Sequence, residues 1–290
     1  MILQETYELN NGVKIPKVGL GTWQIKDGIE EVIKNAVEVG YRLIDTAQAY
    51  GNEEGIGKGI QECGIPREEI FLETKLHATK KDYFSAKQAI DESLVRLDVD
   101  YIDLMIIHSP QPWEEVNQSE ERYYKGNVEA YHALEDAYKE GKLRAIGISN
   151  FLNSDTQNIL DHCSIIQMAN QILTHISNTK LDIIKFNQER NIFIQAYSPI
   201  AHGEILKNEK IIEMANKYNV SVPQLCLRYV IELGAIPIMK TANKDHMISN
   251  AQLDFHITDE DMTILNDFDP IQDYGASSKF PCFGGKKPTY

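Results

Sequence analysis

The sequence is short of several features that would place it in other classes of protein. Lysine and arginine number 29 against 43 aspartates and glutamates, and the net charge of −14 makes a nucleic-acid partner unexpected. No apolar run approaches the roughly 20 residues that span a bilayer, so we expect no membrane association. The chain also opens without a basic and apolar leader, so we expect no signal peptide.

Cysteine is scarce as well. The four cysteines lie far apart in the sequence and form no CxxC pair. This distribution predicts reduced thiols in a cytoplasmic protein, and it favours neither a disulfide framework nor a zinc site. From the sequence we therefore expect no bound metal.

What the sequence does contain is a regular alternation of strand-like and helix-like segments over most of its 290 residues. Amphipathic helical patterns fill the gaps between short apolar runs, as in residues 27–40, 82–98 and 126–142, and several of them end at a glycine. Eight such units in one chain predict a closed (β/α)₈ TIM barrel, with an open doubly wound sheet as the alternative. The expected strands are residues 17–23, 41–47, 70–76, 101–108, 143–150, 165–172, 191–198 and 235–241.

Two further segments complete the expected architecture. The Asn10-Asn11-Gly12 triplet predicts a β-hairpin ahead of the first barrel strand. Residues 269–290 show neither a helix nor a strand period, so we expect a C-terminal loop lying over the barrel mouth. No linker-like composition divides the chain, which predicts one domain over residues 1–290.

Polar residues lie at the carboxyl ends of three neighbouring strands of this expected barrel. Asp45, Lys75 and His108 each end an apolar run, and Tyr50 follows in a loop kept short by Asn52, a good helix N-cap. Reactive groups of such barrels lie at the carboxyl ends of the strands, so these side chains are expected to converge. Strand parity places Glu73 on the side of Lys75, and the sequence leaves open which carboxylate pairs with the lysine.

This combination suits proton donation to an oxygen atom. Tyrosine has a pKa near 10, and a nearby ammonium is expected to lower it. Asp45 would keep Lys75 charged, and His108 would orient the polarised oxygen. Taken one at a time, each residue also has a purely structural explanation, as a turn former, a solvated lysine, a core histidine or a packed tyrosine.

Carbonyl reduction by such a group needs a hydride source, which no side chain supplies. The usual nucleotide motifs are missing: "GLGTWQ" (19–24) lacks the third glycine of GxGxxG, and "GIGKGI" (55–60) lacks the Ser or Thr of a P-loop. Motifs alone therefore do not identify the cofactor.

The sequence nevertheless resembles the aldo-keto reductase family over essentially its whole length. The resemblance is carried by "GLGTW" (19–23), "GYRLIDTAQAYGNEEGIG" (40–57), "ETKL" (73–76), "DLMIIH" (103–108), "IGISNF" (146–151), "NQI" (170–172), "AYSP" (196–199) and "IPIMKT" (236–241). It implies a TIM barrel that binds NAD(P)H across its mouth, with Asp45, Tyr50, Lys75 and His108 as the catalytic tetrad.

The resemblance also implies a set of cofactor-binding positions. Ser149, Asn150 and Gln171 match residues that hold the nicotinamide carboxamide, and Tyr197 matches the ring that stacks on the nicotinamide. Lys240 and Thr241 match a pair at the adenosine phosphate. The full expected set is Gly21, Thr22, Trp23, Asp45, Ser149, Asn150, Gln171, Tyr197, Ser198, Lys240, Thr241, His246 and Asn250.

Departures from the family pattern bear on specificity. His246 stands where an arginine usually clamps the 2′-phosphate, and Ser249 stands where glutamate is common, so we expect a weakened preference for NADPH with some use of NADH. His77 and Ser109 replace common tryptophans, which predicts a wider and more polar substrate pocket. We expect that pocket to be lined by Trp23, Tyr50, His77, His108 and Trp113, with help from the tail aromatics Phe268, Tyr274, Phe280 and Phe283.

The expected function is the reduction of a small-molecule aldehyde or ketone by a compact, bacterial-type reductase that is a monomer or a weak homo-oligomer. Three alternatives stay open at this point. A Schiff-base aldolase would use Lys75 as its nucleophile, and a metal hydrolase would use Asp45 and His108 as ligands. The chain could also be a non-enzymatic NADP(H)-binding regulatory subunit.

Overall fold

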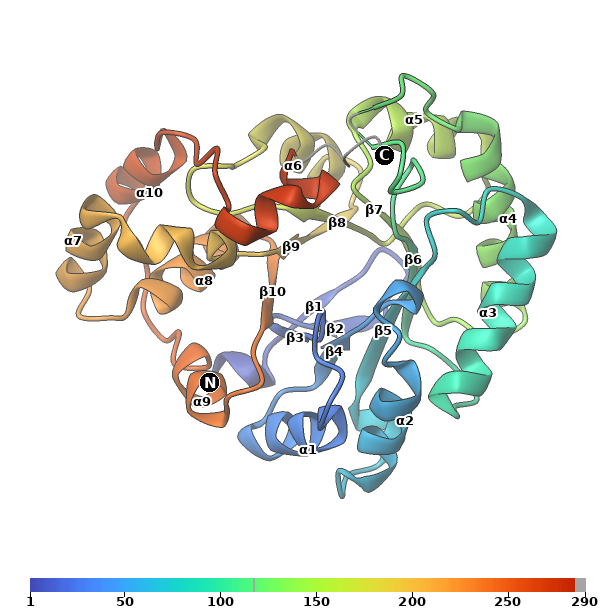
Figure 1. The fold of residues 1–290 in the computed structure, drawn as a ribbon, viewed down its shortest axis with the longest axis horizontal. Helices are drawn as coiled ribbons and strands as arrows, with labels where there is room; N and C mark the ends of the chain where they lie inside the picture. The colour runs from blue at the N-terminus through green and yellow to red at the C-terminus, as the bar shows by residue number, and fades with distance from the viewer. Residues whose placement is uncertain (117, 285–290) are drawn as a thin grey trace.

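The computed structural model describes residues 1–116 and 118–284, and its centre is a closed barrel of eight parallel strands (Figure 1). The strands follow one another around the barrel in sequence order, and the last, β10, pairs with the first, β3. The predicted TIM barrel is confirmed. The strands are β3 (Gly19–Gly21), β4 (Leu43–Asp45), β5 (Phe71–Leu76), β6 (Leu104–Ile107), β7 (Ile146–Ser149), β8 (Ala169–Leu173), β9 (Phe193–Tyr197) and β10 (Ile236–Lys240).

Each strand is shorter than its expected segment and falls inside it, except that β8 runs one residue past its segment to Leu173. The strands are buried on both faces, as parallel strands covered by helices are, and every residue of β3 to β8 is buried. The inner face of β3 is tightly packed, since a Cβ on Gly21 would lie 3.2 Å from Ile238 Cγ2. Glycine at this position leaves room for the Ile238 side chain of β10.

Helices surround the barrel, and their ends follow the glycine signals. Gly40, Gly141 and Gly234, after three of the helices, all have the positive φ that glycine adopts without strain. The helices are α1 (Ile29–Val39), α2 (Glu53–Glu62), α3 (Tyr83–Leu97), α4 (Tyr124–Lys139), α5 (Asn153–His162), α6 (Leu181–Gln188), α7 (Glu209–Lys217), α8 (Val222–Glu232), α9 (Lys244–Asn250) and α10 (Asp259–Asn266). Among the described residues, no helix combines the length and the apolar character that crossing a membrane requires.

The expected hairpin is present and closes the end of the barrel where the strands begin. β1 (Thr6–Glu8) pairs antiparallel with β2 (Lys14–Pro16). In the turn between them, Asn10 donates hydrogen bonds to the carbonyls of Gln167 and Asn191, which precede β8 and β9. A cleft of about 1050 Å³ opens beside this hairpin, at the end of the barrel opposite Tyr50.

The C-terminal tail lies over the barrel mouth, as expected, but it is not purely a loop. Its described part contains two short 3₁₀ helices, η5 (Gly275–Lys279) and η6 (Pro281–Phe283), drawn in red in Figure 1. Ring contacts fix η6 on the mouth, because Phe283 packs on Tyr197 at the end of β9. Residues 285–290 of the expected tail lie outside the described residues.

Candidate active site

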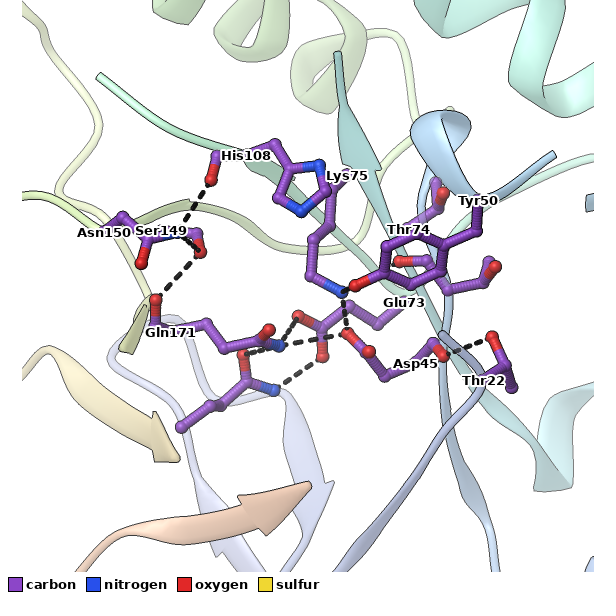
Figure 2. Close-up of polar contacts among 12 residues, drawn as sticks. Thr22, Asp45, Tyr50, Glu73, Thr74, Lys75, His108, Ser149, Asn150 and Gln171 are labelled. Carbon is purple, nitrogen blue, oxygen red and sulfur yellow. Dashed lines mark hydrogen bonds and ion pairs between the residues drawn. The ribbon is translucent and has the colours of Figure 1, made fainter. Parts of the chain in front are cut away.

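Lys75 lies inside the barrel near the end of β5, and its side chain is only 1% exposed. Its ammonium contacts the carboxylate of Asp45, at the end of β4, and donates to the carbonyl of Thr46 over 2.9 Å. The Tyr50 hydroxyl lies 3.4 Å from the same ammonium. Figure 2 shows the three side chains pointing toward one another. One cation thus joins a carboxylate to a phenol.

These contacts keep Lys75 charged. Burial lowers the pKa of Lys75, but the charge of Asp45 and its contact with the ammonium favour the charged form, and the pKa lies above its ordinary value. The ammonium form is therefore the stable one at neutral pH.

Tyr50 belongs to a single 3₁₀ turn, η2 (Gln48–Tyr50), between β4 and α2. Burial raises the pKa of Tyr50 to about 12, and the ammonium of Lys75 opposes this rise without cancelling it. The expected net decrease in the pKa of Tyr50 is therefore wrong, because desolvation of the phenolate is larger than its attraction to Lys75. The phenol stays protonated at neutral pH, which is the form that donates a proton.

Glu73 does not pair with Lys75. Its two carboxyl oxygens accept from the side-chain amides of Gln171, at 3.1 Å, and Gln195, at 2.5 Å (Figure 2). Burial, followed by the charge of Asp45, raises the pKa of Glu73 to about 8. The question that strand parity left open is thus settled in favour of Asp45.

His108 comes one residue after β6, and its ring meets the Tyr50 ring edge-on with centroids 5.7 Å apart. Burial, followed by the charge of Lys75, lowers the pKa of His108 well below its usual value, so the imidazole is neutral. Its buried Nδ1 has no hydrogen-bond partner among the described residues. The His108 ring, which lies against the Tyr50 ring, can therefore still form a hydrogen bond.

The loop after β3 is tied to the loop after β4. Thr22 donates from its hydroxyl to the carbonyl of Asp45 over 2.9 Å. Asn52 occupies the N-cap position of α2 but makes no capping bond, contrary to expectation. Its side chain instead donates to the carbonyls of Thr22 and Ile25 and accepts from Thr46. Asn52 thus holds Thr22 close to the end of β4.

A first group of the expected cofactor residues lies at the ends of β7 to β9. Asn150, with a positive φ of 62°, donates to the carbonyl of His108 and accepts from the Tyr197 hydroxyl at 2.7 Å. Ser149 donates to the backbone carbonyl of Gln171, while the Gln171 amide also donates to Asp45 at 3.0 Å. Gln171 therefore holds the carboxylate of Asp45, a contact the sequence did not predict.

A second group lies on β10 and α9. Lys240 ends β10, is exposed and has no ion-pair partner among the described residues. Thr241 accepts from the backbone N–H of Asn243, and His246 is exposed on α9. Asn250, the last residue of α9, is buried. Since β10 pairs with β9, both groups lie around one side of the mouth.

The expected pocket residues form two sets of contacts. Trp113 packs edge-on against His108, with ring centroids 5.0 Å apart, which joins it to Tyr50. On the other side, Trp23 packs edge-on against Phe280 of the tail at 4.9 Å. His77 follows β5, and its backbone N–H donates to Gln48 beside Tyr50.

The sequence did not predict the contacts of Ser198 or those of the C-terminal tail. Ser198 has a positive φ of 53°, and its hydroxyl hydrogen-bonds His202 at 3.2 Å. The Cys282 thiol, from η6, lies near the Tyr197 hydroxyl. No sequence signal marks Cys282, whereas Gln195 could have been found as a polar residue with the strand parity of Tyr197.

Comparison with known proteins agrees with this geometry. The profile of the Aldo/keto reductase family matches residues 17–270. Glyoxal reductase of Bacillus subtilis (strain 168) is 38% identical over 263 residues, covering 90% of this chain and 91% of that protein.

Solved structures give the same result. An aldo/keto reductase from Brucella melitensis superposes with a TM-score of 0.85 at 34% identity, covering 91% of this chain and 98% of that one. A Bombyx mori aldo-keto reductase in complex with NADP gives 0.83 at 32% identity, covering 96% and 98%. The closed barrel and these relatives identify a barrel oxidoreductase. The chain belongs to the aldo/keto reductase family.

Proposed function

We propose that this chain reduces the carbonyl group of small aldehydes or ketones to an alcohol, with Tyr50 as the proton donor. The observation that carries the proposal is the position of the Lys75 ammonium, which contacts Asp45 and lies 3.4 Å from the Tyr50 hydroxyl. A protonated phenol beside a buried cation is arranged to release a proton and to have the resulting negative charge stabilised.

Each residue has a distinct part in that step. Tyr50 donates its hydroxyl proton to the carbonyl oxygen, and the Lys75 ammonium stabilises the phenolate left behind. Asp45 keeps the ammonium charged and in place, with Gln171 bonded to the same carboxylate oxygen. His108 is neutral and orients the carbonyl oxygen by a hydrogen bond from its ring.

The residues at the mouth fit a nicotinamide dinucleotide, which would supply the hydride when bound. Tyr197 offers a partly exposed ring, and Asn150 and Ser149 offer polar groups beside it. The exposed ammonium of Lys240 fits an anionic phosphate at the other end. We propose NADPH as the preferred cofactor, with NADH also used, because His246 cannot clamp a phosphate with two hydrogen bonds as arginine does.

The mouth suits a small, polar carbonyl substrate. His77 and Ser109 replace bulky apolar walls, and His77 is half-buried with its Nδ1 hydrogen-bonded to Thr79. The name of the Bacillus subtilis relative, glyoxal reductase, points to small dicarbonyl compounds as the first substrates to test.

The contacts of Lys75 argue against the Schiff-base alternative. An aldolase lysine must lose its proton to attack a carbonyl carbon, and Asp45 stabilises the charged form instead. A hydrolytic metal site is also poorly supported, because the Asp45 carboxylate is bonded to Lys75 and Gln171.

The test is oxidation of NADPH, followed by its absorbance, against a panel of aldehydes, keto acids and sugars. Tyr50→Phe should keep cofactor binding and lose about 10²–10⁴-fold in kcat. Tyr124→Phe, at the start of α4, is the matched control and should behave like the unaltered chain. Tight NADPH binding without turnover of any carbonyl would instead favour the regulatory-subunit alternative.

A further inference from the structure

Three side chains with metal-ligating atoms meet on the outside of the barrel, between α4 and the end of α5. His132 and Glu135 lie one turn apart on α4, and Cys163 directly follows α5. One ligand atom of each lies within 4.8 Å of the others. Cys163 precedes β8, so the cluster lies toward the end of the barrel where strands begin, away from Tyr50.

The backbone holds the carboxylate of this cluster in place. Glu135 Oε1 accepts from the N–H groups of Ser164 and Ile165, both at 2.6 Å. Its Oε2 is directed to His132, whose Nδ1 lies 2.9 Å away. The side chain of Glu135 is 3% exposed and that of His132 is 40% exposed. One oxygen of a buried carboxylate is thus presented beside an imidazole that solvent can reach.

A second observation concerns the residue that precedes His132. The Tyr131 side chain is fully buried, and its hydroxyl has no hydrogen-bond partner among the described residues. Tyr131 directly precedes His132 on α4. A buried hydroxyl without a partner is rare, and it would be satisfied by a water or an anionic ligand atom.

We propose that His132, Glu135 and Cys163 form a zinc-binding site with one open coordination position. Imidazole nitrogen, carboxylate oxygen and thiolate sulfur are the ligands that Zn²⁺ takes in proteins, and two anionic ligands neutralise its charge. Ligand atoms around a tetrahedral zinc are roughly 3.3–3.8 Å apart. Bringing the three ligand atoms to these distances therefore needs shifts of about 1 Å at most, which a half-buried cysteine and a partly exposed histidine can make.

The site joins α4 to the segment between α5 and β8. Binding replaces the thiol proton of Cys163 with the metal, and that proton passes to the solvent. The sequence did not reveal this site because its ligands come from two helices and form no short motif. The zinc would hold α4 to this segment, so its loss should lower the thermal stability of the protein and leave the chemistry at Tyr50 intact.

The experiment uses the untagged full chain, stripped of metal with a chelator and titrated with Zn²⁺ against a chromophoric competitor. The expected result is one zinc per chain, an affinity reduced at least tenfold in Cys163→Ser and in His132→Ala, and a Tm that zinc raises in the unaltered chain but not in these two variants. Co²⁺ should give a thiolate charge-transfer band that Cys163→Ser removes.

Cys63→Ser is the matched control, since Cys63 is another half-buried free cysteine and its loss should change nothing. His132→Ala alters a partly exposed side chain and should fold normally, so it remains informative if Cys163→Ser is unstable. Equal zinc affinity in the unaltered chain and in His132→Ala, or a Co²⁺ complex without a thiolate band, would overturn the proposal.

Discussion

The ammonium of Lys75 pairs with Asp45 on the neighbouring strand, although Glu73 lies only two residues away on its own strand. Glu73 is held instead by the amides of Gln171 and Gln195, and burial raises its pKa to about 8. The barrel interior therefore contains one carboxyl in an ion pair and a second that carries a proton at neutral pH.

Replacing Asp45 with asparagine should destabilise the protein strongly. The substitution leaves the buried ammonium of Lys75 without its counter-charge, and breaking such a pair costs about 3–5 kcal/mol in the free energy of unfolding. Urea denaturation measures this. Glu5→Gln, which breaks the exposed pair with Lys17, should cost less than about 1 kcal/mol. Equal costs for the two variants would contradict the structural importance of the buried pair.

Glu73 should make stability depend on pH. The folded state keeps the Glu73 proton up to a pKa of about 8, whereas an unfolded glutamate releases it near 4.5. Between these values the folded state binds more protons, so stability falls as pH rises, by at most about 1.4 kcal/mol per pH unit. Below and above this window the contribution of Glu73 is constant.

Glu73→Gln tests this dependence because it mimics the protonated carboxyl. Its stability relative to the unaltered chain should improve between about pH 5 and about pH 8, as measured by denaturant unfolding. The exposed Glu68→Gln should show no such trend. A constant difference between Glu73→Gln and the unaltered chain across that range would mean that Glu73 is already ionised.

Replacing His246 with arginine should strengthen the preference for NADPH. Hydrogen bonds to charged groups contribute about 1.5–3 kcal/mol, so kcat/KM with NADPH relative to NADH should rise roughly tenfold to a hundredfold. Steady-state kinetics with both cofactors measure the ratio. His256→Arg, at a side chain that is 83% exposed, controls for added charge alone. The same rise in both variants would show that position 246 has no special role.

Tyr274 should fasten the tail to the barrel. Its hydroxyl bonds to the His175 ring at 3.0 Å and to the Asn178 amide at 3.1 Å. Tyr274→Phe removes both bonds, each typically contributing about 1 kcal/mol, so amides of residues 274–284 should exchange faster with solvent. Hydrogen-exchange mass spectrometry measures this, with the barrel strands as the internal reference. Unchanged exchange in the tail would show that ring packing alone holds it.

The sequence predicted the barrel because strands buried on both faces leave apolar runs that helix signals separate. It also predicted the meeting of Asp45, Lys75 and Tyr50, because parallel strands bring their carboxyl ends to one side. Both conclusions depend on the spacing of apolar residues and on the order of strands and helices along the chain, and both of these can be read from the sequence.

Other features depend on contacts between distant residues. Strand parity could not distinguish Asp45 from Glu73 as the partner of Lys75, because the outcome depends on how Gln171 and Gln195 lie across the barrel. The pKa of Tyr50 depends on its depth of burial, which a motif does not report. The position of Cys282 depends on how the tail folds back, which has no periodic signal.

The pairing of β10 with β3 has a consequence for self-association. Every barrel strand is hydrogen-bonded to a neighbour on both sides, so none presents an open row of backbone donors and acceptors to another chain. Adding a strand to the barrel, the usual route to edge-to-edge aggregation, is thereby blocked. Contacts between copies of this chain are left to the outer helices, the loops and the small hairpin.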